Sequence, residues 1–220
     1  MVQSLPVAVE TSPKRSFAWA LDWPGWCRSG GDVDLALDAL VNATPRYAEV
    51  AERAGLAVPD VGPAGLEIVE SVDGDSGTAF GVPTAITSRD RRAMSAGEAE
   101  RLAALVEASW AAFDRVAVAS PAGLRKGPRG GGRDRDTMIV HVIDSDHVYA
   151  RQIGVRLPAG SLADRAAVTL ERTAMLEVLR RPTDGSPLGG GRWPARYAAR
   201  RIAWHALDHA WEMEDRSIPG

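Results

Sequence analysis

Two of the four histidines of this 220-residue chain lie four positions apart, in the segment AWHALDHAWEMED. His205 and His209 share one face of a helix, because an α-helix turns once in about 3.6 residues. Neutral imidazole is a frequent metal ligand, and two imidazoles one turn apart reach the same ion. The alternative interpretation is that both are ordinary helix histidines bonded to backbone carbonyl groups.

A third histidine is predicted to face the same interior. In a helix expected over residues 136–154, His141 shares the apolar stripe of Val142 and Tyr149. Three histidines from two helices then converge, and three protein ligands with an open fourth position are typical of a reactive metal site. His147 lies roughly 120° around that helix and is predicted to face elsewhere.

Acidic and thiol groups are the next candidates for chemistry. Glu212 lies three positions after His209, near the histidine face, whereas Asp208 lies about 100° from His209. Either carboxylate would orient an imidazole or move a proton, and Glu212 is the better placed. Cys27 is a nucleophile or, as we favour, a small hydrophobe after a turn, because no histidine is near it in sequence.

A glycine-rich segment over residues 123–135 carries five cations: Arg125, Lys126, Arg129, Arg133 and Arg135. Guanidinium groups match carboxylates, so Arg129 and Arg133 are candidate contacts for an anionic cofactor. The alternative is a solvated loop. The segment is not a phosphate loop, because it lacks the GxxxxGK[ST] pattern.

Residues 93–220 are predicted to be helical. Apolar residues at helical spacing predict helices over residues 94–119, 136–154, 161–182 and 194–216. The expected start signals are a capping box of Ser95 and Glu98, caps at Asp136 and Ser161, and Pro194 in the first turn of the last helix. Four similar helices predict an all-α, up-down four-helix bundle.

Residues 1–92 are predicted to form a separate α+β domain. Strands are expected over residues 6–12, 16–22 and 65–72, with a weaker one over residues 78–86 that contains a proline. One helix is expected over residues 33–55, with Asp32 as its N-cap and Gly55 as its stop. The predicted order is strand, strand, helix, strand.

Composition restricts the partners and the compartment. The chain is 45% apolar and 25% charged, which is typical of a globular protein. Its net charge of −3 argues against a sequence-independent grip on nucleic acid. No run of about 18 apolar residues predicts a membrane span. A single cysteine, and an opening segment without the apolar core of a signal peptide, predict a cytoplasmic protein.

The segments TMIVHVIDSDHVYARQIG and ARRIAWHALDHAWEMEDR resemble the DinB/YfiT-like superfamily of four-helix bundles. The resemblance covers about residues 93–216. It implies that His141, His205 and His209 bind a divalent metal, zinc first, with nickel or iron as alternatives. Several members are thiol transferases or isomerases that use mycothiol, bacillithiol or glutathione, and others have no known activity.

The segment SFAWALDWPGWCRSGGDVDLALDALVNA is similar to HicB-like antitoxin domains, in which a strand ends in a Pro-Gly-Cys turn followed by Gly-Asp and a helix. Trp26, between Gly25 and Cys27, departs from that pattern. No helix-turn-helix or ribbon-like DNA-binding tail is evident. The resemblance therefore implies a fold more than a toxin-neutralising role.

Together these features predict a metal-dependent enzyme in which the thiolate of a low-molecular-weight thiol such as mycothiol attacks a small-molecule electrophile. The reaction is S-transfer or isomerisation. One alternative is a non-catalytic, metal-stabilised regulatory protein with a HicB-like partner-binding domain. Another is a metal-dependent hydrolase. A homodimer is left open.

Overall fold

The computed structural model describes residues 4–126 and 132–217. Its first part contains a mixed four-stranded sheet in the order β3-β2-β1-β4. The strands are β1 (Leu5–Ser12), β2 (Arg15–Ala20), β3 (Cys27–Gly30) and β4 (Leu66–Asp73). The first three pair antiparallel, and β4 pairs parallel to β1. A parallel partner requires a long connection, and α1 (Val33–Asn42) and α2 (Thr44–Arg53) lie within it.

The predicted order for residues 1–92, strand-strand-helix-strand, differs from the structure in three elements. The short strand β3 was not predicted. The single helix expected over residues 33–55 is two helices, because Pro45 has no N–H to continue the first. Residues 78–86 are not a strand. Asp75 caps a short helix, α3 (Ser76–Phe80), and Gly81 ends it in a left-handed conformation with φ 118°.

The second part is helical, as predicted. Its long helices are α4 (Ala96–Ala119), α5 (Arg135–Gln152), α6 (Arg165–Leu179) and α7 (Ala195–Ser217). The capping box of Ser95 and Glu98 is confirmed. The expected caps at Asp136 and Ser161 are wrong: α5 begins after Asp134, and α6 begins after Asp164, whose carboxylate accepts from the Ala167 N–H.

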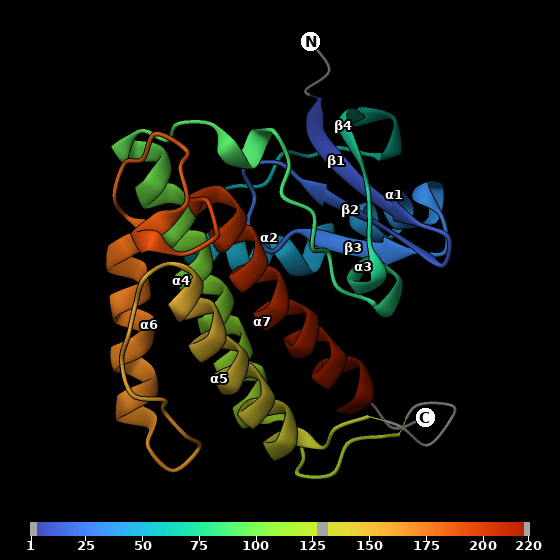
Figure 1. The fold of residues 1–220 in the computed structure, drawn as a ribbon. Helices are drawn as coiled ribbons and strands as arrows, with labels where there is room; N and C mark the ends of the chain where they lie inside the picture. Colours follow the sequence, from blue (N-terminus) through green and yellow to red (C-terminus); the bar gives the residue numbers. More distant parts are fainter. Residues whose placement is uncertain (1–3, 127–131, 218–220) are drawn as a thin grey trace.

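Helix α7 occupies the centre of the molecule. It packs against α4 and α5, and both of these contact α6. Figure 1 shows the sheet on one side of α7 and α6 on the other. Three short 3₁₀ turns connect the larger elements: η1 (Pro63–Gly65), η2 (Arg89–Arg91) and η3 (Leu188–Gly190). The domain boundary expected after residue 92 falls between η2 and α4.

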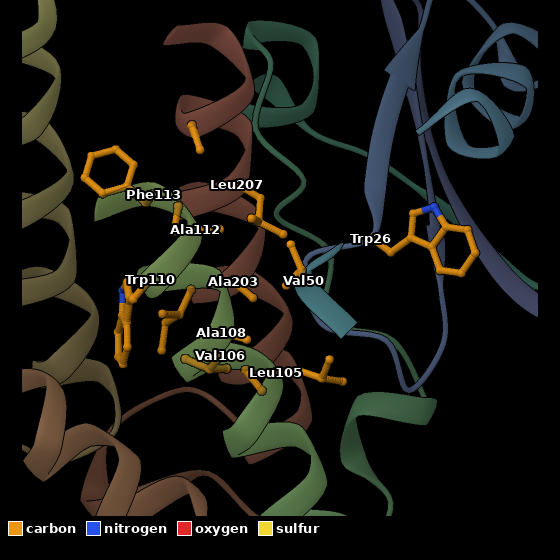
Figure 2. Close-up of a cluster of buried hydrophobic side chains, with 14 of the residues drawn as sticks. Trp26, Val50, Leu105, Val106, Ala108, Trp110, Ala112, Phe113, Ala203 and Leu207 are labelled. Atoms are coloured by element: carbon orange, nitrogen blue, oxygen red, sulfur yellow. The ribbon is translucent and has the colours of Figure 1, made fainter. Parts of the chain in front are cut away.

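One apolar core joins the two parts of the chain. Trp26 and Val50 belong to the same buried cluster as Leu105 of α4 and Leu207 of α7, as Figure 2 illustrates. A smaller cluster packs the other face of the sheet against α7 through Phe17, Trp19 and Trp204. The sheet therefore supports α7 directly. Across residues 4–126 and 132–217, the helices lack the length and apolar composition that a bilayer crossing requires.

Candidate metal centre

The three predicted histidines meet where α5 crosses α7. Each of His141, His205 and His209 offers one ring nitrogen, and these nitrogens lie within 4.8 Å of one another. The ring centroids of His205 and His209 are 4.6 Å apart. The ring centroid of His141 lies 5.0 Å from that of His205 and 4.9 Å from that of His209. The helical register read from the sequence thus places all three side chains together.

The spacing of one nitrogen pair matches that of two ligands on one metal ion. Nε2 of His141 lies 3.2 Å from Nε2 of His205. Metal–nitrogen bonds of about 2.0–2.1 Å in a tetrahedral site place two ligand nitrogens roughly 3.3–3.4 Å apart. The third imidazole is one helical turn along α7. The donor set is neutral nitrogen, which suits zinc, nickel or iron.

Burial and neighbouring positive charge keep the imidazoles of His141 and His205 neutral. Burial, with smaller effects from Arg133 and His209, lowers the pKa of His141 to about 4. Burial likewise lowers the pKa of His205 well below its usual range, helped by His209 and Arg201. His205 is only 5% exposed. At neutral pH both rings therefore carry the free electron pair that coordination needs.

Glu212 is the carboxylate that contacts the triad. Its Oε2 lies 3.2 Å from Nδ1 of His209, and its Oε1 accepts from Nη1 of Arg216 at 2.8 Å. The hydrogen bond to His209 is the main cause of a lowered pKa for Glu212. An ionised Glu212 accepts a hydrogen bond from the Nδ1–H of His209, which leaves Nε2 of that ring free for a ligand role.

Other predicted residues lie away from the triad. Asp208 pairs with Arg28 of β3 at 3.3 Å, on another face of α7. His147 contacts Glu171 of α6 at 2.7 Å. Cys27 is buried, and burial raises the pKa of its thiol to about 12, so the thiolate form is suppressed.

The arginine-rich segment is only partly described. Arg129 lies outside the described residues. Arg133 is exposed, and its charge lowers the pKa of His141, which places it on the side of the triad. Arg125 donates to the backbone carbonyl of Asp215, and Lys126 pairs with Asp134 at 2.6 Å. Arg135 donates to the Asp136 carboxylate at 2.8 Å and to the Ser120 carbonyl at 3.1 Å, so three of the five cations bind the protein itself.

Two residues that were not proposed as site residues, Tyr149 of α5 and Arg201 of α7, lie beside the triad. Arg201 is buried, and it donates to the Tyr149 hydroxyl at 3.1 Å and to the Pro83 carbonyl at 3.5 Å. The Tyr149 ring packs edge-on to His205 with centroids 5.5 Å apart. Their spacing could have identified them from the sequence. Arg201 lies one helical turn before His205, and Tyr149 lies two turns after His141, so each shares a helix face with a histidine.

The structure thus contains a site of three histidines in which Glu212 orients the His209 ring. Tyr149 and Arg201 are buried beside His205, and Arg133 is an exposed cation near His141. No family profile, curated protein or solved structure matches this chain.

Proposed function

We propose that this protein is a metal-dependent enzyme in which His141, His205 and His209 hold one divalent ion, with zinc preferred over nickel or iron. The supporting observation is the convergence of three imidazoles from α5 and α7. Two of the three have lowered pKa values. Three protein ligands leave a coordination position for a reactant.

We further infer that α4 to α7 form an up-down four-helix bundle of the DinB-like type, with residues 1–92 as a HicB-like domain against it. The inference is supported by the packing of α7 against α4 and α5, and of both against α6. In such a bundle, metal sites are built from inward side chains on facing helices. His141, on α5, and the pair on α7 meet that description.

The reactant proposed for the open position is a low-molecular-weight thiol such as mycothiol. A bound divalent ion lowers the pKa of a coordinated thiol, which makes it a nucleophile at neutral pH. The thiolate then forms a bond from sulfur to the electrophilic atom of a small molecule. In S-transfer a leaving group of that molecule departs with the bonding electrons, and in thiol-assisted isomerisation the thiolate is itself expelled again. Glu212 fixes the proton on Nδ1 of His209 and so holds that ring in one tautomer and orientation.

Electrostatics near the triad favour an anionic thiol. Arg133 is exposed and close enough to act on the charge of His141. A carboxylate on the thiol would find a guanidinium partner there. Arg129, in the same segment, is proposed for the same role on the basis of its sequence position. Tyr149 and Arg201 form the buried floor below His205 and exclude water from that side.

The test is spectroscopic. Cobalt-substituted protein titrated with mycothiol or glutathione should develop a sulfur-to-metal charge-transfer band, because thiolate is a soft ligand. Cys27→Ser should keep the band, since Cys27 is buried with a raised pKa. A metal-loaded protein that ignores every such thiol at millimolar concentration would contradict the thiol role. Turnover of electrophiles or esters without thiol would instead indicate a hydrolase.

A further inference from the structure

Two histidines of the proposed metal site differ in how their rings are held. Glu212 binds Nδ1 of His209, whereas the buried Nδ1 of His205 has no hydrogen-bond partner within the part of the chain that the structure describes. A ligating histidine normally donates its second ring N–H to a carboxylate or a carbonyl, which fixes its orientation. His205 instead packs against the rings of Tyr149 and Trp204, with centroids 5.5 and 6.1 Å away. Its orientation therefore depends on the residues that hold these two rings.

Arg201 contacts both of these rings. Its Nη2 donates to the Tyr149 hydroxyl at 3.1 Å, and its guanidinium lies 4.7 Å from the centroid of the Trp204 ring. Arg201 is 8% exposed, so these contacts lie in the interior. Its other terminal nitrogen, Nη1, donates to the carbonyl of Pro83, which is 118 positions away in the sequence. Arg201 thus joins the surroundings of His205 to the N-terminal part of the chain.

Residues 83–85 form a connecting segment between the sheet and α7. Three consecutive carbonyls of this segment accept from three side chains of α7: Pro83 from Arg201 at 3.5 Å, Thr84 from the Tyr197 hydroxyl at 3.2 Å, and Ala85 from Arg200 at 2.9 Å. All three donor side chains are buried. Because a backbone carbonyl moves only when the chain moves, the position of the connecting segment decides where these side chains lie.

Glu10 of β1 holds the opposite side of the connecting segment. Its two carboxylate oxygens accept the backbone N–H groups of Thr84 and Ala85, each at 3.1 Å, and Oε1 also accepts from the Thr78 hydroxyl. Glu10 is 0% exposed. Hydrogen bonds from N–H groups to a carboxylate are short and strong, so two of them fix the segment against β1.

We propose that Glu10 is a positioning residue for the metal centre, and that the sheet sets the orientation of His205 through the connecting segment and Arg201. Because it acts on a metal ligand, this role rests on the proposed metal-binding function. One ligand is then oriented from a strand of the N-terminal part, whereas Glu212, on α7 itself, orients His209. A change at Glu10 should therefore act on His205 more than on His209.

Glu10→Gln tests the connection with little change of shape. The amide keeps one acceptor oxygen, but it places an NH₂ donor against the N–H of either Thr84 or Ala85. One of the two backbone hydrogen bonds is lost and two donors face each other, so the connecting segment moves away from β1. The Pro83 carbonyl moves with it, and Arg201 loses an acceptor that keeps its guanidinium in place.

Zinc affinity of the full-length protein is measured by competition with a chromophoric chelator, at a temperature where circular dichroism shows that each variant is folded. Glu10→Gln should weaken zinc binding about ten-fold, the lower end of the range for a lost outer partner of a ligating histidine. Asp32→Ala is the matched control, because it removes the N-cap of α1 without touching residues 83–85. It should lower the melting temperature but keep zinc affinity within about three-fold of the wild type.

Tyr149→Phe tests the far end of the connection, and it supplies a second measurement if Glu10→Gln does not fold. It keeps the ring and removes the hydroxyl that Arg201 binds, so it should also weaken zinc binding. Because both changes break the same connection, the double variant should lose less affinity than the product of the two single losses. Independent, multiplicative losses would mean that the two residues act separately.

Ring signals of the histidines distinguish positioning from a general loosening of the fold. The chain has four histidines, so their Cε1–H signals in the metal-free protein can be assigned from single variants. Glu10→Gln should shift the signal of His205 more than that of His209, because Glu212 holds the His209 ring independently of the sheet.

The outcomes separate this role from the proposed function. A wild-type protein that binds no zinc contradicts the metal function. Zinc binding by the wild type with unchanged affinity in Glu10→Gln, or in Tyr149→Phe, overturns the positioning role alone. Equal losses in Glu10→Gln and Asp32→Ala also overturn it, as do equal shifts of the His205 and His209 signals, because general loosening would then explain the effect.

Discussion

Nδ1 of His209 lies 3.2 Å from Oε2 of Glu212, one turn further along α7. The same carboxylate binds Arg216 through its other oxygen. Glu212 therefore fixes the orientation of the His209 ring, and Arg216 fixes Glu212. The proposed metal ligand His209 is therefore held by a hydrogen bond from outside the metal site, and the contribution of that bond to metal affinity can be measured.

We expect Glu212→Gln to weaken metal binding by about 10- to 100-fold, which is typical when a hydrogen-bond partner of a ligating histidine is lost. The amide removes the negative charge that favours the proton on Nδ1 of His209. Competition with a fluorescent chelator measures the affinity. The variant should stay folded, because the side chain of Glu212 is 35% exposed.

Asp208→Asn is the matched control, since it changes another acidic residue of the same helix. Asp208 pairs with Arg28 rather than with a histidine. Its metal affinity should stay within about three-fold of the wild type, because it makes no contact with a ligand ring. Equal losses in the two variants would show that general charge, not the orientation of His209, matters.

The joint between the loop after β2 and α7 can be tested at Gly25. Its φ is 92°, and an added Cβ would lie 2.6 Å from Cδ1 of Leu207. Gly25→Ala should therefore destabilise the protein through both backbone strain and overlap with α7. Gly55→Ala shares a positive φ of 72° but meets nothing within 4 Å. It should cost only the strain of about 1–2 kcal/mol.

Urea unfolding of the two glycine variants gives the comparison. The loss for Gly25→Ala should exceed that for Gly55→Ala by about 1–3 kcal/mol, the usual range for overpacking. Metal content should follow stability, because α7 carries two of the three histidines. Equal losses would mean that the loop moves away from α7 without cost.

A buried carboxylate predicts an unusual pH dependence of stability. Burial raises the pKa of Asp146 from 3.8 to about 6, although Arg172 beside it acts in the opposite direction. Between about pH 4 and pH 6 the folded protein therefore binds more protons at this group than the unfolded chain does. Stability contributed by Asp146 is present at low pH and is lost as the pH rises through this window.

Asp146→Asn removes that titration. The difference in unfolding free energy between the variant and the wild type should shift in favour of the variant as the pH rises from 4 to 7. The expected shift is about 1.4 kcal/mol for each unit by which the pKa is raised. Urea melts at several pH values measure it. Parallel curves for the two proteins would contradict a raised pKa.

Regular periodicity made much of the helical part predictable. The stripe through His205 and His209 follows from the turn of one helix, and His141 follows from the apolar stripe of another. Ser95 and Glu98 gave a local signal for the start of α4, and that start is confirmed. Glu212 was selected by spacing alone, and it contacts His209.

Features that depend on distant contacts were not predictable in the same way. Strand β3 has four residues and exists because β2 pairs with it. Residues 78–86 have strand-like composition, yet the capping interactions of Asp75 and the left-handed Gly81 produce a helix and a turn. The contact between the Arg200 guanidinium and the Trp19 ring joins two elements about 180 positions apart in the sequence, and no local pattern predicts it.

The metal content of the full-length protein, purified without a histidine tag, tests the central claim most directly. Elemental analysis should find close to one divalent ion per chain, and His141→Ala, His205→Ala and His209→Ala should each lose most of it. His147→Ala should retain the ion, because His147 contacts Glu171 instead of the triad. A folded wild-type protein without a bound metal after exposure to zinc, or a loss confined to His147→Ala, would contradict the account.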